Sequence, residues 1–370
     1  MKQRRILYLV PHRFGRSPGQ RFRCEHFIPY LEEAGYKITY SNALNRWDDK
    51  YFYSYGKYLA KLFIVIKVFC KRCFDILRVK QYDIVFIYRE AFMLGTVFFE
   101  RLIGLLKIPI VFDFDDSIWL NDTSQGNQNL KWMKRPFKTA DICKLASVVI
   151  VGNRYLADYA RQYNENIYII PTTIDLHYHT NDLIKTDKEY IVIGWTGTRT
   201  TLRHFYMLKN VYSSLQKIYG KKIRYKVIAD IPPSHDDGEF DIEFVEWNKE
   251  LEISQLLSID IGIMPLPDDQ WARGKCGFKG LQYMSLSIPA IMSPVGVNNE
   301  IIQHGRNGYL ALTEEEWIQY LSALIENADL RQELGQAGKK TIEERFAVEN
   351  YKNQYVEIFN SLIQHELDRN

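Results

Sequence analysis

The sequence predicts an α/β protein of two domains, each built on a parallel sheet with helices on both faces. The chain has 370 residues, which is too long for one typical core. Short, continuous apolar segments alternate with helical stretches, as in parallel sheets that are buried on both faces. A polar segment without periodicity, NDLIKTDKEY, places a linker at residues 176–189.

The first predicted domain, residues 1–175, begins with the apolar run ILYLV (6–10), which Pro11 ends at once. This run is too short for a secretory signal and is typical of a buried first strand. A loop, HRFGRSPGQ, and a helix over 21–35, with Gly35 as its stop, follow. The further strands of this domain are predicted at 36–41, 82–88, 108–114, 147–152 and 167–171.

Residues 51–80 are predicted to form one long or two shorter helices rich in aromatic and basic side chains. Nowhere do 18 uncharged apolar residues follow one another, so no membrane span is expected. The pattern fits a helix at a membrane interface, with lysines reaching the headgroups. A helix packed on the core, with a solvated basic face, is the alternative.

Charge is distributed unevenly along the chain. Residues 1–170 carry 27 Lys and Arg against 16 Asp and Glu, whereas the remainder carries 21 against 29. The first domain is therefore expected to face an anionic membrane surface or a lipid diphosphate, not nucleic acid. Five cysteines give no disulfide framework, so we expect a cytoplasmic protein, peripheral on the inner face of the membrane. Cys70 and Cys73 are interpreted as helix neighbours in a core.

The second predicted domain, residues 190–345, alternates strands and helices in the same way. Helices are predicted at 252–258 and 281–286, and three helical stretches follow residue 314. Strands are predicted at 190–197, 224–230, 242–247, 261–267 and 290–292.

The segment 271–300, WARGKCGFKGLQYMSLSIPAIMSPVGVNNE, carries the strongest chemical signal. Its glycines allow close backbone approach to a ligand, and the start of the next helix offers unpaired N–H groups. Lysines in this loop could neutralise a leaving diphosphate without a metal. A solvated basic turn before a core helix is the alternative. The loop contains Arg273, Gly274, Lys275, Gly277 and Lys279.

The runs KCGFKGLQYM, SIPAIMSPVGVNNEII and HGRNGYL resemble the donor-site segment of family 4-type (group 1) retaining glycosyltransferases of bacterial polysaccharide biosynthesis. The resemblance implies the GT-B fold, two Rossmann-like domains facing across a cleft, with residues 346–370 packing back on the first domain. It also implies transfer of a sugar from a nucleotide diphosphate sugar to a growing, lipid-linked glycan (surface polysaccharide, O-antigen or capsule), with retention and no metal or other cofactor.

The resemblance assigns donor-binding roles in the second domain. Lys279 and Lys275 would stabilise the leaving diphosphate, aided by the helix start near Phe278, and Gln282 would hold the ribose. The first glutamate of the family's Glu-x7-Glu pair is replaced by Gly274, which leaves the sugar preference open. The remaining donor-side candidates are a glycine-rich turn, a base-stacking aromatic and a later glutamate: Gly194, Gly197, Arg199, Trp247 and Glu300.

Polar residues that follow strands of the first domain are the acceptor-side candidates. Arg13, Arg16 and Arg21 could hold an acceptor diphosphate, with a solvated loop as the alternative. By resemblance, Asp115 and Asp116 stand where the family has a sugar-facing His-Asp pair, so Asp115 could contact donor or acceptor hydroxyls.

Two further interpretations of the acidic residues in the first domain stay open. Glu90 is either a second acceptor-side carboxylate or an ion-pair partner for Arg89 or Arg101. The D-x-D of Asp113 and Asp115 would be able to hold a divalent ion.

Two other functions also fit the predicted fold. One is a nucleotide-sugar epimerase with a similar two-domain cleft, which needs no basic first domain. The other is a non-catalytic nucleotide-sugar-binding subunit of a membrane assembly, which the loss of both family glutamates allows.

Overall fold

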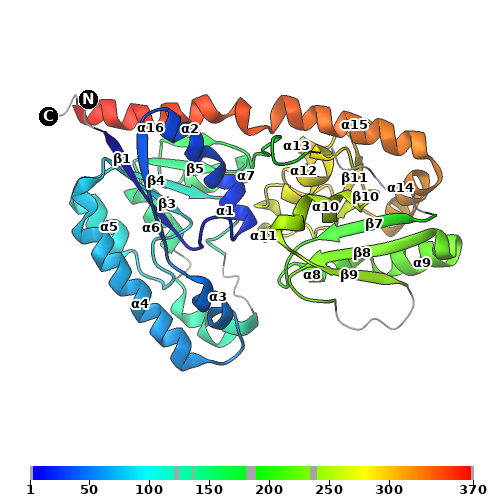
Figure 1. Cartoon of the computed structure of the whole chain (residues 1–370), viewed down its shortest axis with the longest axis horizontal. Helices are drawn as coiled ribbons and strands as arrows, with labels where there is room; N and C mark the ends of the chain where they lie inside the picture. The colour runs from blue at the N-terminus through cyan, green and yellow to red at the C-terminus, as the bar shows by residue number, and fades with distance from the viewer. Residues whose placement is uncertain (1–2, 121–124, 136, 181–188, 234–239, 368–370) are drawn as a thin grey trace. The chain divides into compact units, whose positions relative to one another are not determined.

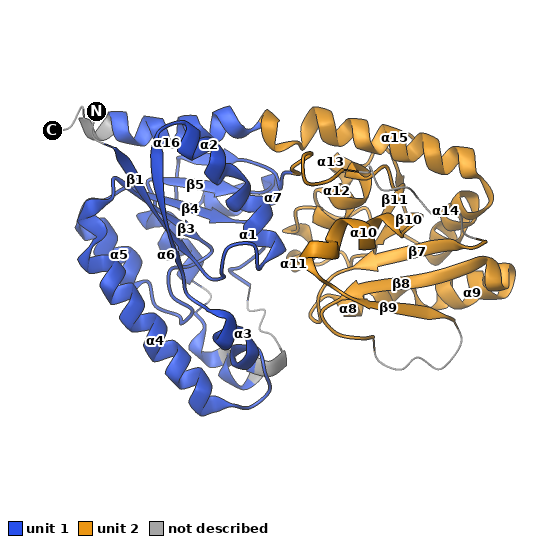
Figure 2. Ribbon diagram, viewed as in Figure 1, with its two compact units in different colours: residues 1–173, 351–370 blue, residues 174–350 orange. Residues whose placement is uncertain are grey.

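The computed structural model describes residues 3–120, 125–135, 137–180, 189–233 and 240–367. The chain forms two compact units (Figure 2). Unit 1 comprises residues 1–173 and 351–370, and unit 2 comprises residues 174–350. The sequence places the corresponding boundaries at 175 and 345. Of the predicted linker 176–189, residues 181–188 lie outside the described part of the chain.

Unit 1 is built on a six-stranded parallel sheet in the order β2-β1-β3-β4-β5-β6 (Figure 1). Each strand corresponds to one of the apolar runs that the sequence marks as a buried strand. Strands β3 and β4 are buried along their whole length. The strands are β1 (Arg4–Val10), β2 (Tyr36–Asn42), β3 (Ile84–Tyr88), β4 (Ile110–Phe114), β5 (Val148–Val151) and β6 (Ile167–Ile169).

The single helix predicted over 21–35 is wrong. The structure has two short helices there, α1 (Pro18–Arg23) and α2 (Ile28–Glu33), separated by a 3-10 turn at Glu25–Phe27. Pro29 lacks an N–H and its ring clashes with the carbonyl four residues earlier, so it suits the first turn of a new helix. The break turns the chain between the β1 loop and β2.

The other helices of unit 1 cover its sheet. The segment predicted as one long or two shorter helices forms two, α3 and α4. The helices are α3 (Arg46–Phe52), α4 (Tyr58–Leu77), α5 (Phe98–Leu105), α6 (Lys138–Leu145), α7 (Arg154–Ala160) and α16 (Lys352–Leu367). In the described part of the chain, no helix is long and apolar enough to cross a membrane.

The C-terminal helix α16 packs on unit 1. The ring of Tyr355 stacks on Phe27, with 4.1 Å between centroids and 9° between planes. Oδ1 of Asn360 accepts hydrogen bonds from Nη1 of Arg4 at 3.0 Å and from the hydroxyl of Tyr36 at 2.8 Å. A stacked pair and two polar contacts therefore anchor the end of the chain beside the first two strands. Residues 368–370 of the predicted 346–370 segment lie outside the described part.

Unit 2 repeats the architecture, with a parallel sheet in the order β12-β11-β10-β7-β8-β9. Its strands are β7 (Ile191–Thr196), β8 (Ile223–Ala229), β9 (Ile242–Glu246), β10 (Ile261–Met264), β11 (Ala290–Met292) and β12 (Tyr309–Leu310). Its helices are α8 (Leu202–Phe205), α9 (Lys209–Tyr219), α10 (Glu252–Leu257), α11 (Gln270–Arg273), α12 (Phe278–Ser285), α13 (Asn298–Ile301), α14 (Glu314–Glu326) and α15 (Ala328–Arg345).

Both sheets reverse their strand order at one point. In unit 1 the chain adds β2 on one side of β1 and then β3 on the other. In unit 2 it adds β8 and β9 on one side of β7 and then β10 on the other. Ligands of such sheets bind outside the carboxyl ends of the strands at these switch points. The loops after β1, β3, β7 and β10 are therefore the places to look for a site.

Candidate functional site

In unit 2, the basic segment of residues 273–279 runs from the end of α11 into the first turn of α12, in the connection that follows β10. Gly277, which precedes α12, has φ of +69°, a conformation that favours glycine. A methyl group there would come within 2.2 Å of Cδ1 of Ile301, so no larger residue fits without a shift. The positive end of α12 is thus presented at the switch point, where an anion is stabilised.

The two predicted catalytic lysines converge at the carboxyl edge of the unit 2 sheet. Nζ of Lys279 lies 5.4 Å from the centre of the Trp195 ring, at the end of β7, and Nζ of Lys275 lies 5.8 Å from that of Trp271. Burial first, and then the charges of Lys279 and Lys275, lower the pKa of His204 to about 3. Both lysines therefore act on one buried imidazole, and unit 2 brings them together.

No local pattern in the sequence singles out His204. It lies in α8, which follows the loop after β7, and only 3% of its surface is exposed. Its Nδ1 has no hydrogen-bond partner among the described residues, while Nε2 faces Nε of Arg203 at 3.5 Å. A lone histidine in a helix carries no local signal, because only the fold places it beside the lysines.

The two glycines predicted to form a phosphate loop differ in role. Gly194 lies inside β7, and a Cβ there would come within 2.3 Å of Cγ1 of Ile259. Its small size is therefore required by packing against Ile259, and its donor-binding role stays a prediction. Gly197 does lie in the loop, where a Cβ would meet Cη2 of Trp195 at 2.2 Å. Arg199 is exposed, and its backbone N–H donates to Oδ1 of Asp230 at 2.6 Å.

The other donor-side candidates lie at different depths. Gln282 is only 2% exposed, and its Nε2 has no hydrogen-bond partner among the described residues. Gly274 is buried at the end of α11, whereas Phe278 is half-buried as the first residue of α12. Glu300 is exposed in α13.

Arg273 forms an ion pair on the surface of unit 2. Its Nε lies 2.7 Å and its Nη2 3.0 Å from the two carboxylate oxygens of Asp268, and both side chains are about half exposed. An exposed pair of this kind contributes little to stability. The guanidinium can therefore exchange this carboxylate for a ligand at small cost.

Trp247 follows β9 at the same edge of the unit 2 sheet. Its Nε1 donates to Oε1 of Glu252 at 3.2 Å, and Oε2 of that carboxylate accepts from the hydroxyl of Tyr178 at 3.0 Å. The indole is half-buried, so these bonds fix its orientation while part of the ring stays accessible. This geometry allows either base stacking or simple packing.

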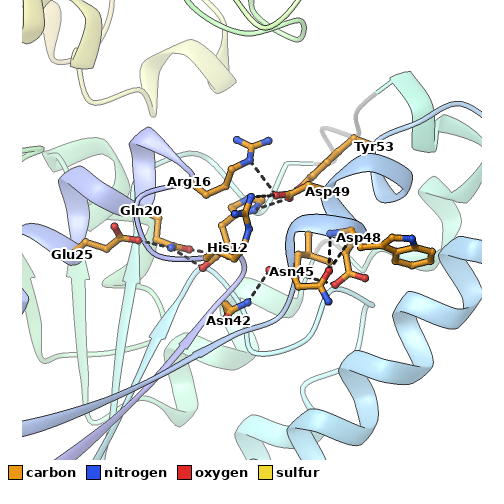
Figure 3. Close-up of polar contacts among 12 residues, drawn as sticks. His12, Arg16, Gln20, Glu25, Asn42, Asn45, Asp48, Asp49 and Tyr53 are labelled. Atoms are coloured by element: carbon orange, nitrogen blue, oxygen red, sulfur yellow. Dashed lines mark hydrogen bonds and ion pairs between the residues drawn. The ribbon is translucent and has the colours of Figure 1, made fainter. Parts of the chain in front are cut away.

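In unit 1, the loop after β1 is closed by its own polar contacts (Figure 3). Oδ2 of Asp49 accepts from Nη2 of Arg13 at 2.8 Å and from Nε of Arg16 at 3.2 Å. The side chain of Gln20 bonds both backbone groups of His12, at 3.0 and 2.9 Å. Both arginine side chains remain more than a third exposed, so they can still reach a ligand.

Arg21 does not lie on this exposed loop as predicted. It belongs to α1 and is 5% exposed, with its guanidinium 5.0 Å from the centre of the Phe22 ring. Helix α1 begins at Pro18, before the predicted start at residue 21, and Arg21 is buried in its last turn. Nearby, Arg23 pairs with Asp113 through Nε at 3.2 Å and Nη2 at 2.8 Å. Burial raises the pKa of Asp113 to about 6, although Arg23 opposes that rise.

Asp115 and Asp116 are held together by Arg89, at the carboxyl ends of β4 and β3. Nη2 of Arg89 lies 2.6 Å from an oxygen of each carboxylate, and the hydroxyl of Tyr88 donates to Asp115 at 2.8 Å. Burial alone would raise the pKa of Asp115, but the charges of Arg89 and Arg23 outweigh it and hold the pKa below its usual range. Asp115 is therefore an ionised hydrogen-bond acceptor.

Glu90 pairs with neither Arg89 nor Arg101, the partners that the sequence suggests. Its Oε2 accepts from Nζ of Lys138 at 2.8 Å, and that ammonium also bonds the carbonyl of Leu94 at 2.7 Å. The partner of Glu90 comes from α6, 48 residues away along the chain. In the described ranges, no group of three His, Cys, Asp or Glu residues is arranged to hold a metal ion.

Residues 192–327 match the family model described as "Glycosyl transferases group 1". No curated protein matches the sequence. Similar solved structures include sucrose-phosphate synthase from Thermosynechococcus elongatus, with 12% identity, a TM-score of 0.63, and coverage of 98% of this chain and 100% of that one. HepE from Anabaena, in complex with UDP and glucose, has 14% identity and a TM-score of 0.64, and the match covers 97% of this chain and 100% of that one. A glycosyltransferase from Rickettsia africae has 13% identity and a TM-score of 0.66, with coverage of 98% of this chain and 99% of that one.

These structural likenesses show the fold, which is the GT-B fold, and confirm the predicted α/β class. The family match covers β7 to α14, the part of unit 2 that carries the basic loop and its helix. Most of unit 2 thus matches a group 1 glycosyltransferase domain. This finding favours the transferase over the epimerase interpretation.

Proposed function

We propose that unit 2 binds a nucleotide diphosphate sugar and that the protein transfers its sugar to a lipid-linked glycan of a surface polysaccharide, such as O-antigen or capsule. The observation that carries the proposal is the convergence of Lys279 and Lys275 on His204 where α12 begins. The solved complexes of HepE with UDP and with UDP-glucose support a nucleotide-sugar donor.

The chemistry of sugar transfer explains why this edge needs positive charge. When the bond between the anomeric carbon and the donor oxygen breaks, the leaving nucleotide diphosphate gains negative charge. Two ammonium groups and the start of α12 would stabilise that charge without a metal ion. His204 stays neutral because of its low pKa, so it adds no charge to the cluster.

On the acceptor side, the Arg89–Asp115–Asp116 cluster supports binding of sugar hydroxyls. An ionised carboxylate accepts hydrogen bonds from hydroxyls, and the lowered pKa of Asp115 makes it a weak base. We therefore assign Asp115 to orienting a hydroxyl and not to removing its proton. The half-exposed Arg13 and Arg16 would hold the diphosphate of a lipid carrier. Transfer with retention of anomeric configuration is part of the proposal.

The first experiment measures thermal stabilisation by UDP-, GDP- and dTDP-sugars, with and without magnesium. Native protein is compared with Lys279→Ala and with Lys222→Ala, an exposed lysine before the amino end of β8, away from the site. We expect a metal-independent shift with one nucleotide class, lost in Lys279→Ala and kept in Lys222→Ala. A shift that needs magnesium and ignores Lys279 would contradict the donor site.

The second experiment separates transfer from binding alone. Purified protein is incubated with the stabilising donor and a panel of lipid-linked oligosaccharides, and the product linkage is read by NMR. An α-linked product from an α-linked donor supports retention. Donor binding without turnover for any acceptor favours the non-catalytic interpretation, whereas a product of inverted configuration contradicts retention.

A further inference from the structure

Helix α4 of unit 1 buries charged side chains beside Ile64 and Val68 and turns most of its large apolar side chains outward. Its buried face includes Lys61, Arg72 and Asp75, each at most 3% exposed. Its outward face carries leucines, phenylalanines and an isoleucine, and Leu59 and Leu77 are more than 80% exposed. A helix packed against a core in water normally shows the opposite arrangement. We therefore expect a binding partner to remove these outward apolar side chains from water.

The buried charges of α4 are satisfied where they lie. Nη1 of Arg72 lies 2.9 Å from Oδ2 of Asp75, and its Nε donates to the carbonyl of Ala91 at 2.6 Å. Nζ of Lys71 donates to the carbonyl of Asn42 at 2.6 Å. Rotating the helix would break these bonds and leave their buried partners, the carbonyl of Ala91 and the hydroxyl of Ser41, without Arg72, at a cost in stability. The protein thus fixes the helix with its apolar side chains pointing outward.

The exposed apolar side chains recur at spacings of three and four residues, so they line one face of α4. Neighbouring helices extend this face. Phe63 meets Trp47 of α3 at 6.2 Å between ring centroids, and Phe69 meets Phe98 of α5 at 6.4 Å. Helices α4 and α5 lie side by side along unit 1 (Figure 1). We call these exposed residues the apolar face: Trp47, Tyr58, Leu59, Leu62, Phe63, Ile66, Phe69, Phe74, Leu77, Phe98 and Leu105.

Positive charge surrounds the apolar face. Residues 46–80 contain nine Lys and Arg against three Asp. Exposed basic residues lie near both ends of α4, with Lys50 and Lys57 before it and Lys80 after it. Two of the three carboxylates are already in ion pairs, Asp48 with Lys67 and Asp75 with Arg72. The chemistry that complements an apolar face with a basic rim is an apolar layer beneath anionic headgroups.

We propose that the apolar face of unit 1 docks on the surface of an anionic lipid bilayer. The α4 helix would lie in the plane of the interface, with its leucine and phenylalanine side chains among the acyl chains and its flanking lysines at the headgroups. The charge pattern distinguishes this partner from a second copy of the chain, whose identical basic rim would repel it. The inference concerns unit 1 alone and does not depend on the proposed sugar transfer.

Flotation of the full-length protein with lipid vesicles tests the proposal, using phosphatidylcholine alone or mixed with phosphatidylglycerol. We expect binding to the mixed vesicles that weakens as salt is raised. Leu62→Gln combined with Ile66→Gln should weaken it at least tenfold. Both side chains are exposed, so the fold should be retained. The matched control, Ile218→Gln with Leu312→Gln, alters two equally exposed apolar residues of unit 2 and should bind as the native protein does.

The charge contribution is tested by Lys57→Ala combined with Lys80→Ala. Each lysine near an anionic surface contributes about fivefold in partitioning, so the pair should lower binding to mixed vesicles by roughly 25-fold and leave binding to phosphatidylcholine unchanged. Failure of the native protein to float with anionic vesicles would overturn the proposal. So would self-association in sedimentation that the Leu62 and Ile66 substitutions abolish, because a second copy would then cover the face.

Discussion

Nη2 of Arg89 lies 2.6 Å and Nε 2.9 Å from the same oxygen, Oδ1, of Asp115. The backbone of Arg89 is left-handed, with a φ of +62°. Its backbone N–H donates to the carbonyl of Asp113 at 2.8 Å, which fixes the position of the residue. Left-handed backbone at a non-glycine residue costs energy and tends to persist where the surroundings enforce it, often at functional sites. The backbone of α1 also approaches this pair closely, since a Cβ added at Gly19 would lie 3.0 Å from Oδ2 of Asp115.

The first prediction concerns Asp115→Asn. Loss of the negative charge leaves Arg89 with one carboxylate partner, Asp116, among the described residues, so the free energy of unfolding should fall by about 1–3 kcal/mol. If Asp115 orients an acceptor hydroxyl, kcat/KM for the acceptor should fall at least tenfold while donor affinity stays the same. Urea unfolding and steady-state kinetics measure the two effects.

Asp158→Asn is the matched control for Asp115→Asn. Asp158 makes a 2.6 Å ion pair with Arg161, and both side chains are more than half exposed. The same substitution there should change stability by less than about 0.5 kcal/mol and leave transfer unchanged. A stability loss at Asp115 without any loss of transfer would assign that residue to the fold alone.

The strands of both units could be predicted from the sequence because parallel strands are continuous apolar runs. The run IPIVFDF contains β4, and AIM is β11. The basic loop before α12 could be located for a similar reason, since glycines and lysines are local signals. Contacts that depend on tertiary structure could not be predicted. The carboxylate of Asp113 meets Arg23 across 90 residues of chain, and that of Glu90 meets Lys138 across 48.

The sequence left the orientation of α4 open between an apolar face turned outward, as at a membrane interface, and a helix packed on the core with a solvated basic face. Periodicity defines two faces but does not say which one is buried, and the ordinary rule would have buried the phenylalanines. Cys70, interpreted as part of a core, is exposed, and Cys73 is half-buried. The reason is that Arg72, with its partners Asp75 and Ser41, occupies the buried side. Such a network is visible only when the helices and strands are assembled.

The second prediction is acid destabilisation linked to two histidines. In the folded protein, burial lowers the pKa of His12 to about 4 and that of His204 to about 3, from 6.5. Below pH 6.5 the unfolded chain binds these protons and the folded protein does not, so stability falls as pH falls. Each histidine contributes up to about 1.4 kcal/mol per pH unit until its folded pKa is reached.

Asp113 acts in the opposite direction. Its folded pKa of about 6 lies above the ordinary value of 3.8, so the folded state binds this proton first and gains stability as pH falls from 6 to 4. For His12, His204 and Asp113 together, unfolding between pH 6 and pH 4 should therefore take up close to one proton. Urea unfolding at several pH values measures the slope. His204→Gln should reduce it by about one proton, and an unchanged slope would contradict the low pKa.

The third prediction concerns Gly277→Ala, which places a methyl group where φ is +69° and Cδ1 of Ile301 lies 2.2 Å away. Strain and clash together should lower the free energy of unfolding by about 1–3 kcal/mol and reduce donor-induced stabilisation, because α12 would shift. Gly305→Ala is the control, since its φ of +74° is similar but nothing lies within 4 Å of the added methyl. It should cost about 1 kcal/mol and leave donor binding intact.

A double variant distinguishes clash from strain at Gly277. Ile301→Ala removes the atoms that the new methyl would meet, so adding it to Gly277→Ala should restore part of the donor response. Ile301 is fully buried, so its truncation also creates a cavity that lowers stability by about 2–5 kcal/mol. The informative quantity is therefore the donor-induced shift measured against each variant without donor. If the double variant responds no better than Gly277→Ala alone, the glycine conformation itself is what donor binding requires.

The last prediction uses the buried amide of Gln282, whose Nε2 has no hydrogen-bond partner among the described residues. Gln282→Met keeps the side-chain volume but removes the polar group, so stability without donor should stay the same or rise by up to about 1 kcal/mol. If Gln282 holds the ribose, donor affinity should fall about two- to tenfold. Calorimetric titration and urea unfolding separate the two effects. Gln303→Met, at an exposed glutamine of the same unit, should change neither. A variant that gains stability and binds donor as tightly as before would remove Gln282 from the site, because an amide that neither the core nor the ligand uses has only its desolvation cost to contribute.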